Sequence, residues 1–202
     1  MVLSLAVLAT TLTLHLASTV SALPGAPPSL PRFTSIQYSG NGCPSGARLD
    51  SGNFDDPTFA FRSFAIQTSA GAANLTANCQ IHVQADGASS GWQVALSEIN
   101  VQARAVLDPS ETVTYYAQVY FSEDAATTGT FRGNIVNPGS ERIDSAITIN
   151  QSTRDAVVWS PCIGGDGSPG LLNVNFRTVL NGEGYGYFEV FTEHWKFNWR
   201  RC

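Results

Sequence analysis

The chain has little charge, a single lysine (Lys196) and few cysteines, and each shortage narrows the class of protein. Only 13% of its 202 residues are Asp, Glu, Lys or Arg, and the formal net charge is −5. A mild acidic excess without basic clusters argues against a nucleic-acid or anionic-membrane partner. No window of a dozen residues repeats its apolar positions with the 3.6-residue period of an amphipathic helix. The composition therefore points away from helical folds.

The first 22 residues carry no charged side chain. An apolar run over residues 2–17, followed by small residues up to Ala22 and then by prolines, is typical of a secretory signal peptide cleaved after Ala22. A transmembrane anchor is the alternative, but the run is short and Thr-rich for the roughly 20 apolar residues that a span needs. We expect a signal peptide at 1–22, a Pro-rich segment at 23–32 and one domain at 33–202, secreted and free of the membrane.

Cysteine is scarce but even in number: Cys43, Cys79, Cys162 and Cys202. In a secreted chain an even count indicates disulfides, and no two cysteines have the close spacing of a zinc site. Three pairings are possible, and we favour Cys43–Cys79 and Cys162–Cys202 because each joins neighbours in sequence. In the chain-entropy account, loops of some forty residues stabilise the fold by about 3–4 kcal/mol each. A bonded Cys202 holds the last strand against fraying.

Two sequons are present, one at Asn74 and one at Asn150. Asn-X-Ser/Thr motifs in a secreted chain are acceptors for N-glycans and lie on the surface. We therefore expect a glycoprotein, with both asparagines in surface loops.

Apolar and polar residues alternate over 115–121, 172–177 and 194–199, as they do in half-buried strands. Within 92–106 the alternation changes phase, which predicts a β-bulge or bend near Ser97-Glu98. Strands at intervals of roughly ten residues favour an antiparallel β-sandwich of jelly-roll-like form. Further expected strands are 33–38, 58–66, 80–84, 130–135, 145–149 and 156–159. The Gly-rich stretch 164–170 predicts a mobile loop.

Several short stretches together resemble a known group of proteins. They are SIQYSGNGCP at 35–44, NCQ at 78–80, GW at 91–92, VWSPC at 158–162 and WRRC at 199–202. The chain from about Phe33 onward is similar to the small secreted fungal family catalogued as domain of unknown function 4360. The resemblance implies a fungal, extracellular, cysteine-stapled β-protein. That family has no established reaction, so no catalytic residue is implied.

Two patterns of catalytic residues, one of esterases and one of glycoside hydrolases, have partial matches in the sequence. Residues 87–91 fit the Gly-x-Ser-x-Gly motif of esterases, with His194 further on, but the esterase turn joins a strand to a helix and this stretch lies between two expected strands. Jelly-roll glycoside hydrolases instead need two carboxyl groups about 5–9.5 Å apart. Glu98 with Glu189 or Glu193 is the candidate pair, and the last two are expected on one face of the final strand. A glycoside hydrolase is therefore the alternative function.

The sequence has few residues in patterns that would bind a metal ion or a cofactor. After signal cleavage only His82 and His194 remain as imidazole ligands, and neither stands at the new N-terminus. Asp55, Asp56 and Asp166 lie in turn-rich stretches without the ligand spacing of a calcium loop. We expect no metal and no cofactor.

Aromatic side chains are the better guide to a ligand, because their rings offer flat apolar surfaces with polar tips. Tyr185 and Tyr187, in a Gly-rich stretch, are the tyrosines expected to be exposed and form the candidate ligand face. Trp92, Trp159 and Trp199 are expected inside. Tyr115, Tyr116, Tyr120 and Trp195 are further candidates for a sugar-stacking face.

Together these features predict a secreted, monomeric β-sandwich and favour a binding or structural protein of the fungal cell wall or extracellular space over an enzyme. A cell-wall polysaccharide or a host protein is the expected partner.

The signal peptide yields the first prediction. Mature protein recovered from the medium should begin at or close to Leu23, because the small residues up to Ala22 form the cleavage site. N-terminal sequencing checks this. A chain that still begins at Met1 and stays in the membrane fraction contradicts it.

Overall fold

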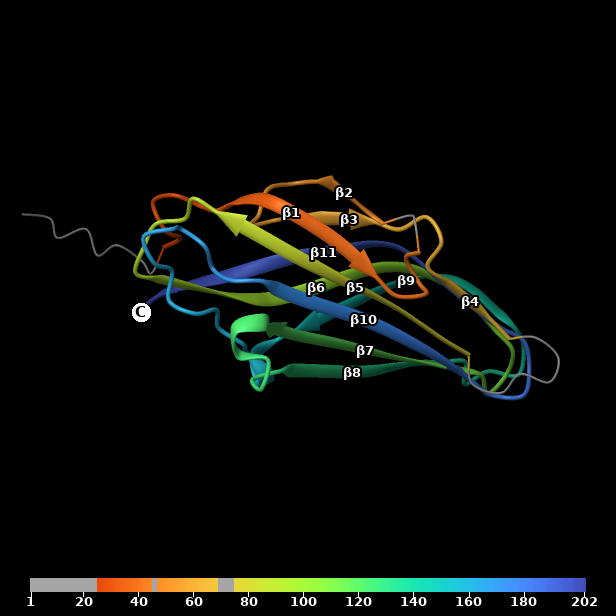
Figure 1. Cartoon of the computed structure of the whole chain (residues 1–202). Coiled ribbons are helices and arrows are strands. Elements are labelled where there is room, and N and C mark those ends of the chain that lie inside the picture. The colour runs from red at the N-terminus through yellow and green to blue at the C-terminus, as the bar shows by residue number, and fades with distance from the viewer. Residues whose placement is uncertain (1–24, 45–46, 69–74) are drawn as a thin grey trace, which may run out of the picture.

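The computed structural model describes residues 25–44, 47–68 and 75–202. Within these ranges the chain forms strands and two short 3-10 turns, η1 (Ser122–Asp124) and η2 (Arg154–Ala156), and no α-helix (Figure 1). The expected signal peptide and Asn74 lie outside the described residues. The strands are β1 (Arg32–Ser39), β2 (Arg48–Ser51), β3 (Thr58–Ala60), β4 (Ala65–Gln67), β5 (Leu75–Asp86), β6 (Trp92–Leu107), β7 (Thr112–Phe121), β8 (Gly129–Val136), β9 (Ile143–Ser152), β10 (Leu172–Asn181) and β11 (Gly186–Arg201).

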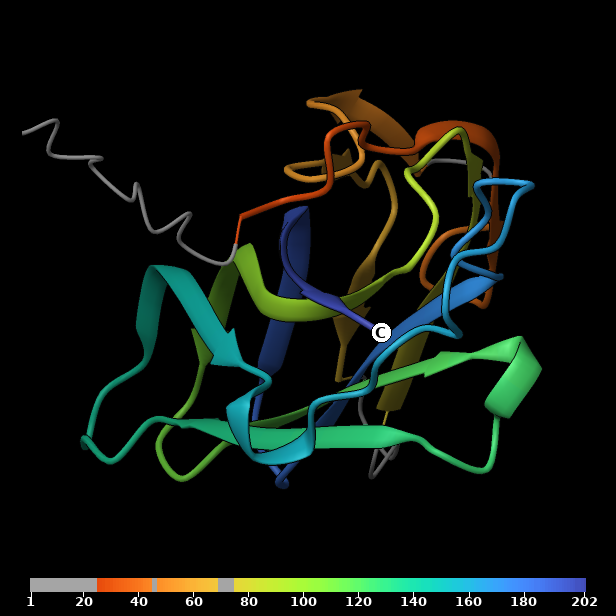
Figure 2. The same ribbon diagram turned by 90° about the vertical axis from the view of Figure 1, so that its left-hand side faces the viewer.

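The strands form two antiparallel sheets, which Figure 2 shows as two layers seen from the end where the C-terminus lies. Sheet A has the order β1-β5-β10-β7-β8, and sheet B has the order β2-β3-β11-β6-β9, with β4 also pairing with β11. Four antiparallel pairs are nested along the chain: β3 with β11, β5 with β10, β6 with β9, and β7 with β8. This nesting is the pattern of a jelly roll, so the expected fold class is confirmed.

Aromatic rings fill the space between the sheets. Trp195 of β11 is fully buried and packs on Phe59 of β3, with ring centroids 4.5 Å apart. Phe64 meets Phe176 of sheet A at 6.0 Å and so joins the two layers. Trp195 therefore belongs to the core and not to a sugar-stacking face. Of the tryptophans expected inside, Trp92 is buried, and Trp159 and Trp199 are partly exposed.

Two bulges set which side chains of sheet B face the core. Ser97 is an extra residue in β6, between the pairs Lys196–Glu98 and Phe197–Leu96, as the phase change predicts. Phe191 is an extra residue in β11, between the pairs at Val190 and Thr192, and it is 41% exposed. The alternation changes phase here too, from Phe188 and Val190 to Trp195 and Phe197. Because Phe191 is itself apolar, this change does not show where the extra residue lies.

Two expected strands are wrong in detail. The segment 58–66 is divided into β3 and β4, because residues 61–64 turn so that Phe61 and Phe64 both enter the core. The segment 156–159 is not a strand: it follows η2 and makes one isolated bridge, from Trp159 to Ala95. Its apolar residues are used in covering the sandwich and not in a sheet.

Both favoured disulfides are present. Cys43 and Cys79 are buried against the core with Cα atoms 5.4 Å apart, and Cys162 and Cys202 are exposed with Cα atoms 5.9 Å apart. The second bond ties the end of β11 to the start of the Gly-rich loop.

That loop, expected to be mobile, is anchored along its length. The amide of Ile163 donates to the carbonyl of Trp92, and the amide of Gly91 donates to the carbonyl of Ile163. The amide of Ala88 donates to Gly167 further along. Ile163, Ala88 and Trp92 also form a small second core. Loop 162–171 is therefore part of the folded scaffold.

The two disulfides differ in solvent exposure, and the more exposed bond should be reduced first. Because thiol exchange needs access to the sulfur atoms, mild reductant should open Cys162–Cys202 before Cys43–Cys79, whose cysteines are 3% and 1% exposed. Alkylation with mass spectrometry at increasing reductant gives the order. Simultaneous labelling of all four cysteines, or earlier labelling of Cys43 and Cys79, contradicts the assignment.

Candidate functional site

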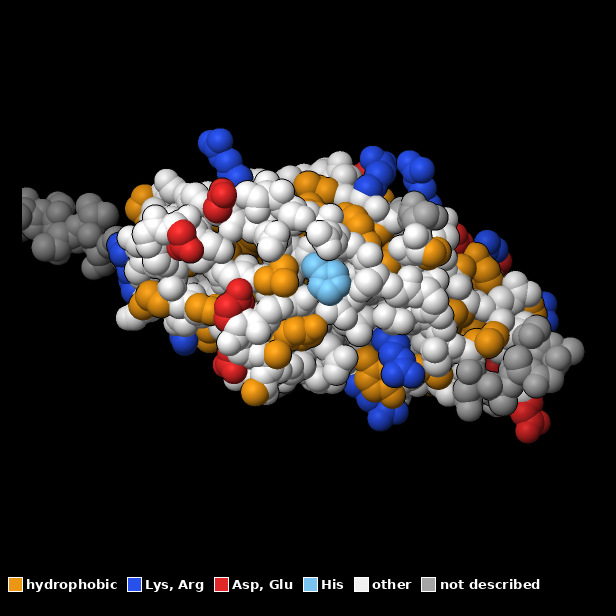
Figure 3. Space-filling view, viewed as in Figure 1, with side chains coloured by type: hydrophobic (Ala, Val, Ile, Leu, Met, Phe, Trp, Pro, Cys, Tyr) orange, Lys and Arg blue, Asp and Glu red, His pale blue; other side chains and the backbone are white. Residues whose placement is uncertain are grey.

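The outer face of sheet A carries two adjoining rows of uncharged polar side chains, and beyond them a row in which Asn78 lies beside the exposed Arg177. Register places His82 of β5 beside Asn173 of β10, and Asn173 beside Tyr120 of β7. The next row is Gln80, Asn175 and Gln118. We call this surface the amide face; it comprises Asn78, Gln80, His82, Gln118, Tyr120, Asn173 and Asn175. Figure 3 shows a histidine near the centre of the view, hydrophobic side chains close to it and several acidic side chains toward the end at left.

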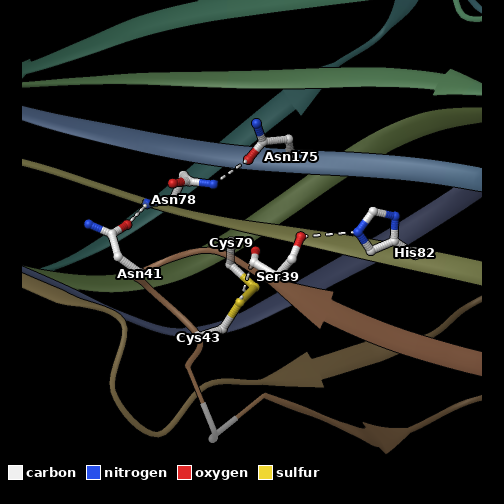
Figure 4. The surroundings of a disulfide bond; sticks show 7 residues. All are labelled: Ser39, Asn41, Cys43, Asn78, Cys79, His82 and Asn175. Atoms are coloured by element: carbon white, nitrogen blue, oxygen red, sulfur yellow. Dashed lines mark hydrogen bonds between the residues drawn. A yellow bond between two sulfur atoms is a disulfide. The ribbon is translucent and has the colours of Figure 1, made fainter.

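A hydrogen-bond network fixes the side chains of the first row. Asn173 is 2% exposed, and its Nδ2 donates to the Leu171 carbonyl at 3.0 Å and to Ser122 Oγ at 2.9 Å. Its Oδ1 is therefore the acceptor that His82 Nδ1 meets at 2.7 Å. When neutral, His82 then carries its proton on Nδ1, and Nε2 accepts from Ser39 Oγ at 3.0 Å (Figure 4).

The hydroxyl of Tyr120 is also oriented by this network. Gln80 Nε2 donates to it at 2.8 Å, so the hydroxyl oxygen acts as an acceptor toward the protein. Its own proton is left to point outward as a donor. The amide face thus offers donors and acceptors whose polarity is set before any ligand arrives.

The buried disulfide supports the same face from below. Asn41, two residues before Cys43, accepts the Asn78 amide with its Oδ1 at 2.9 Å and donates from Nδ2 to the Thr76 carbonyl at 2.9 Å. Figure 4 shows the Asn41–Asn78 hydrogen bond beside the Cys43–Cys79 disulfide, and the hydrogen bond from the Asn78 side chain to Asn175. The turn after β1 is therefore held onto β5 by a covalent bond and by side-chain hydrogen bonds.

Two adjoining cavities open where β1 and β5 meet loop 162–171. One, of about 140 Å³, is lined by Ser35, Gln37, His82, Gln84 and Leu171. The other, of about 390 Å³, shares Gln84 and Leu171 and continues past acidic residues. We call the two together the β5 groove; the second cavity is also lined by Thr34, Ala85, Asp86, Glu123, Asp166, Ser168 and Gly170.

The wall of the β5 groove is held in place by its own hydrogen bonds. The carboxylate of Glu123 accepts the Leu171 amide with both oxygens, at 3.0 and 3.1 Å. Gly170 has φ of +93°, and a Cβ there would collide with the Glu123 carboxylate. A side chain at position 170 is therefore excluded both by the backbone conformation and by the close approach of Glu123.

The tyrosines expected to form the ligand face lie at sheet B instead. Tyr185 is half-buried, and the guanidinium of Arg142 lies 4.6 Å from its ring centroid. Tyr187 is half-buried in β11 and donates its hydroxyl to Glu189 at 2.7 Å. Burial, chiefly, raises the pKa of Tyr187 to about 12. Each tyrosine therefore has a contact within the protein, Tyr185 with Arg142 and Tyr187 with Glu189.

The three candidate catalytic carboxylates do not converge, which corrects the expectation that two of them share a face. The Phe191 bulge turns Glu193 into the core, where it is 1% exposed, and leaves Glu189 on the outer face. Glu189 pairs in register with Arg104, six residues along β6 from Glu98, and at ~3.4 Å per residue that is about 20 Å. Glycoside hydrolysis needs carboxyl groups about 5–9.5 Å apart. Glu98, Glu189 and Glu193 therefore do not supply the pair that the hydrolase alternative requires.

Other residues considered in the sequence have structural partners. His194 Nε2 lies 2.7 Å from Asp56, and Trp199 donates to Asp55 at 2.6 Å, so both acids fasten a turn onto β11. Ser89 Oγ accepts the Ser29 amide in the β5–β6 connection. Among the described residues, no three His, Cys, Asp or Glu side chains are grouped to hold a metal ion, and no helix there has the length and apolarity to cross a membrane.

Asn150, the sequon within the described residues, lies in an edge strand and not in a loop. It is exposed in β9, which borders sheet B, and it pairs in register with Asn100 of β6. A glycan attached to Asn150 would lie on sheet B and not on the amide face of sheet A.

The fold and the face define a disulfide-linked jelly-roll domain with an uncharged hydrogen-bonding surface. Residues 31–202 match the family model described as Domain of unknown function (DUF4360), so the chain belongs to that family. No curated protein matches the chain.

Two solved structures show remote likeness. The carbohydrate-binding module TmCBM61, in complex with β-1,4-galactotriose, is 9% identical with a TM-score of 0.26, over 85% of this chain and 91% of that one. The enzymatically active domain of tailspike protein 4 from bacteriophage CBA120 is 11% identical with a TM-score of 0.23, over 79% and 19%. At such scores neither likeness says what this chain binds.

Buried Glu193 generates a prediction about stability and pH. Its carboxyl accepts Trp195 Nε1 at 2.7 Å, but burial outweighs this bond and raises its pKa to about 7. Because burial favours the neutral carboxyl, its contribution to stability is fully present at a pH below the unfolded pKa of about 4.5. This contribution is lost as the pH rises through the folded pKa of about 7 and the buried carboxyl ionises. The free energy of unfolding should fall by on the order of 3 kcal/mol across that window.

Urea unfolding at pH 5 and pH 8 measures this change. Glu193→Gln should flatten the pH dependence, while Glu189→Gln on the outer face of the same strand should keep it. Equal pH dependence in the wild type and in Glu193→Gln would show that Glu193 is not responsible.

Proposed function

We propose that the protein is a secreted, non-catalytic domain that binds polysaccharide through the amide face. The observation that carries the proposal is the uncharged, pre-oriented array of amides, imidazole and tyrosine hydroxyl across β5, β10 and β7. Sugar hydroxyls donate and accept hydrogen bonds, and side-chain amides do both within one planar group. A face of this kind matches a sugar polymer better than it matches a protein, whose interfaces favour an apolar centre.

Two further features support an extracellular setting. The two disulfides suit an oxidising compartment, and the signal peptide expected at 1–22 leads there. The wall or the surrounding space of a fungal cell, rich in neutral polysaccharide, is the proposed place of action.

Binding to insoluble polymers tests the function. Purified mature protein is mixed with chitin, β-glucan, cellulose and xylan, and the supernatant is assayed for protein and for released sugar. We expect retention on at least one polymer without released sugar. Reduced, unfolded chain serves as the control for adsorption.

Two outcomes overturn the proposal. Released sugar shows a hydrolase, and the absence of retention on every polymer leaves a protein partner as the better hypothesis.

A further inference from the structure

We propose that the β5 groove is the primary sugar-binding site and that it takes neutral polysaccharide chains while rejecting anionic ones. This inference rests on the proposed function and locates it at one end of the amide face. Its basis is the lining of the two cavities, the unengaged amides within them and the charge at their far end.

The smaller cavity has the chemistry that a sugar ring requires. Register places Gln37 beside His82, and Ser35 beside Gln84, so amides stand on two neighbouring strands around one hollow. Within the described residues, neither Gln37 nor Gln84 has a side-chain hydrogen bond to the protein. Each amide is thus available to a ligand as both donor and acceptor. Leu171 supplies an apolar contact for the C–H face of the ring.

The groove is long enough for a chain and not only for one ring. His82, Gln84 and Asp86 point to the same side of β5, and four residues at ~3.4 Å per residue span about 14 Å. The second cavity continues this line at about 390 Å³. A polymer lying along β5 therefore contacts the amides first and the acidic residues further along.

Charge at the far end sets the selectivity. Asp86, Glu123 and Asp166 line the larger cavity, and no lysine or arginine lines either cavity. None of the ion pairs among the described residues involves these three acids. A uronate or sulfate group would come within the screening length of about 8 Å at physiological ionic strength. Neutral chains avoid that repulsion.

The site is also rigid before binding. His82 is held between Ser39 and Asn173, and loop 162–171 is held by the Cys162–Cys202 bond and by Glu123. A preformed groove loses little conformational entropy when the ligand enters, which favours affinity.

Paired substitutions test the location of the site. Depletion isotherms on the polymer that retains the wild type should show at least about tenfold weaker binding for Gln37→Ala/Gln84→Ala, because two neutral hydrogen bonds are lost. The matched control is Gln67→Ala/Gln102→Ala, which removes two exposed glutamines from sheet B. Equal thermal midpoints confirm that the fold is unchanged.

Charge selectivity has its own test. At low salt the wild type should not bind polygalacturonate, and Asp86→Asn/Asp166→Asn should gain measurable binding. Wild-type binding to polygalacturonate, or no gain in the variant, overturns the charge selectivity.

The outcomes separate the two proposals. If the wild type binds a polymer but Gln37→Ala/Gln84→Ala binds equally well, the groove is not the site and the proposed function stands. If Tyr185→Ala/Tyr187→Ala abolishes binding instead, the site lies on sheet B. If no polymer retains the wild type, the proposed function fails first.

Discussion

β6 and β11 are each 16 residues long and pair along their whole length, from Gly186 opposite Leu107 to Arg201 opposite Trp92. This pairing is the constraint on which the other elements depend, because β3, β4 and β9 have no place in sheet B except along the outer sides of these two strands. Trp195 projects from β11 between the layers and is enclosed there. The bulges at Ser97 and Phe191 adjust the pairing so that apolar residues continue to face inward.

Sheet A depends on a different kind of interaction, in which polar side chains brace one another. Asn173 is nearly buried and links His82, Gln80 and the carbonyl of Leu171. Because a buried amide must have its hydrogen bonds satisfied, Asn173 fixes its neighbours as firmly as a packed apolar residue would. The outer surface of the sheet is thereby ordered across three strands by hydrogen bonds between side chains.

Features that depend on residues close together in the sequence could be predicted. Features that depend on the pairing of distant strands could not. Alternation located most strands, a phase change located the Ser97 bulge, and proximity in sequence indicated the two disulfides. The Phe191 bulge was missed because Phe191 is itself apolar, which hides the change of phase between Val190 and Trp195. The groove could not be predicted either. Gln37 and Gln84 are polar residues at outward positions of expected strands, as ordinary solvent-facing residues are. Only the register of the strands shows that they lie close together. Tyr185 and Tyr187 were selected for their ring chemistry and their Gly-rich surroundings, and such local features cannot show that Arg142 lies over the Tyr185 ring.

The position of the central strand also bears on how the protein is made. β11 is the last element of the chain, yet it lies between β3 and β6, and Cys202 closes the second disulfide. Domains commonly fold as the chain leaves the ribosome, N-terminal parts first. Sheet B therefore lacks its central strand until β11 has been synthesised, and the strands made earlier have unpaired edges until then. Loss of β11 would remove the centre of a sheet and not merely a tail.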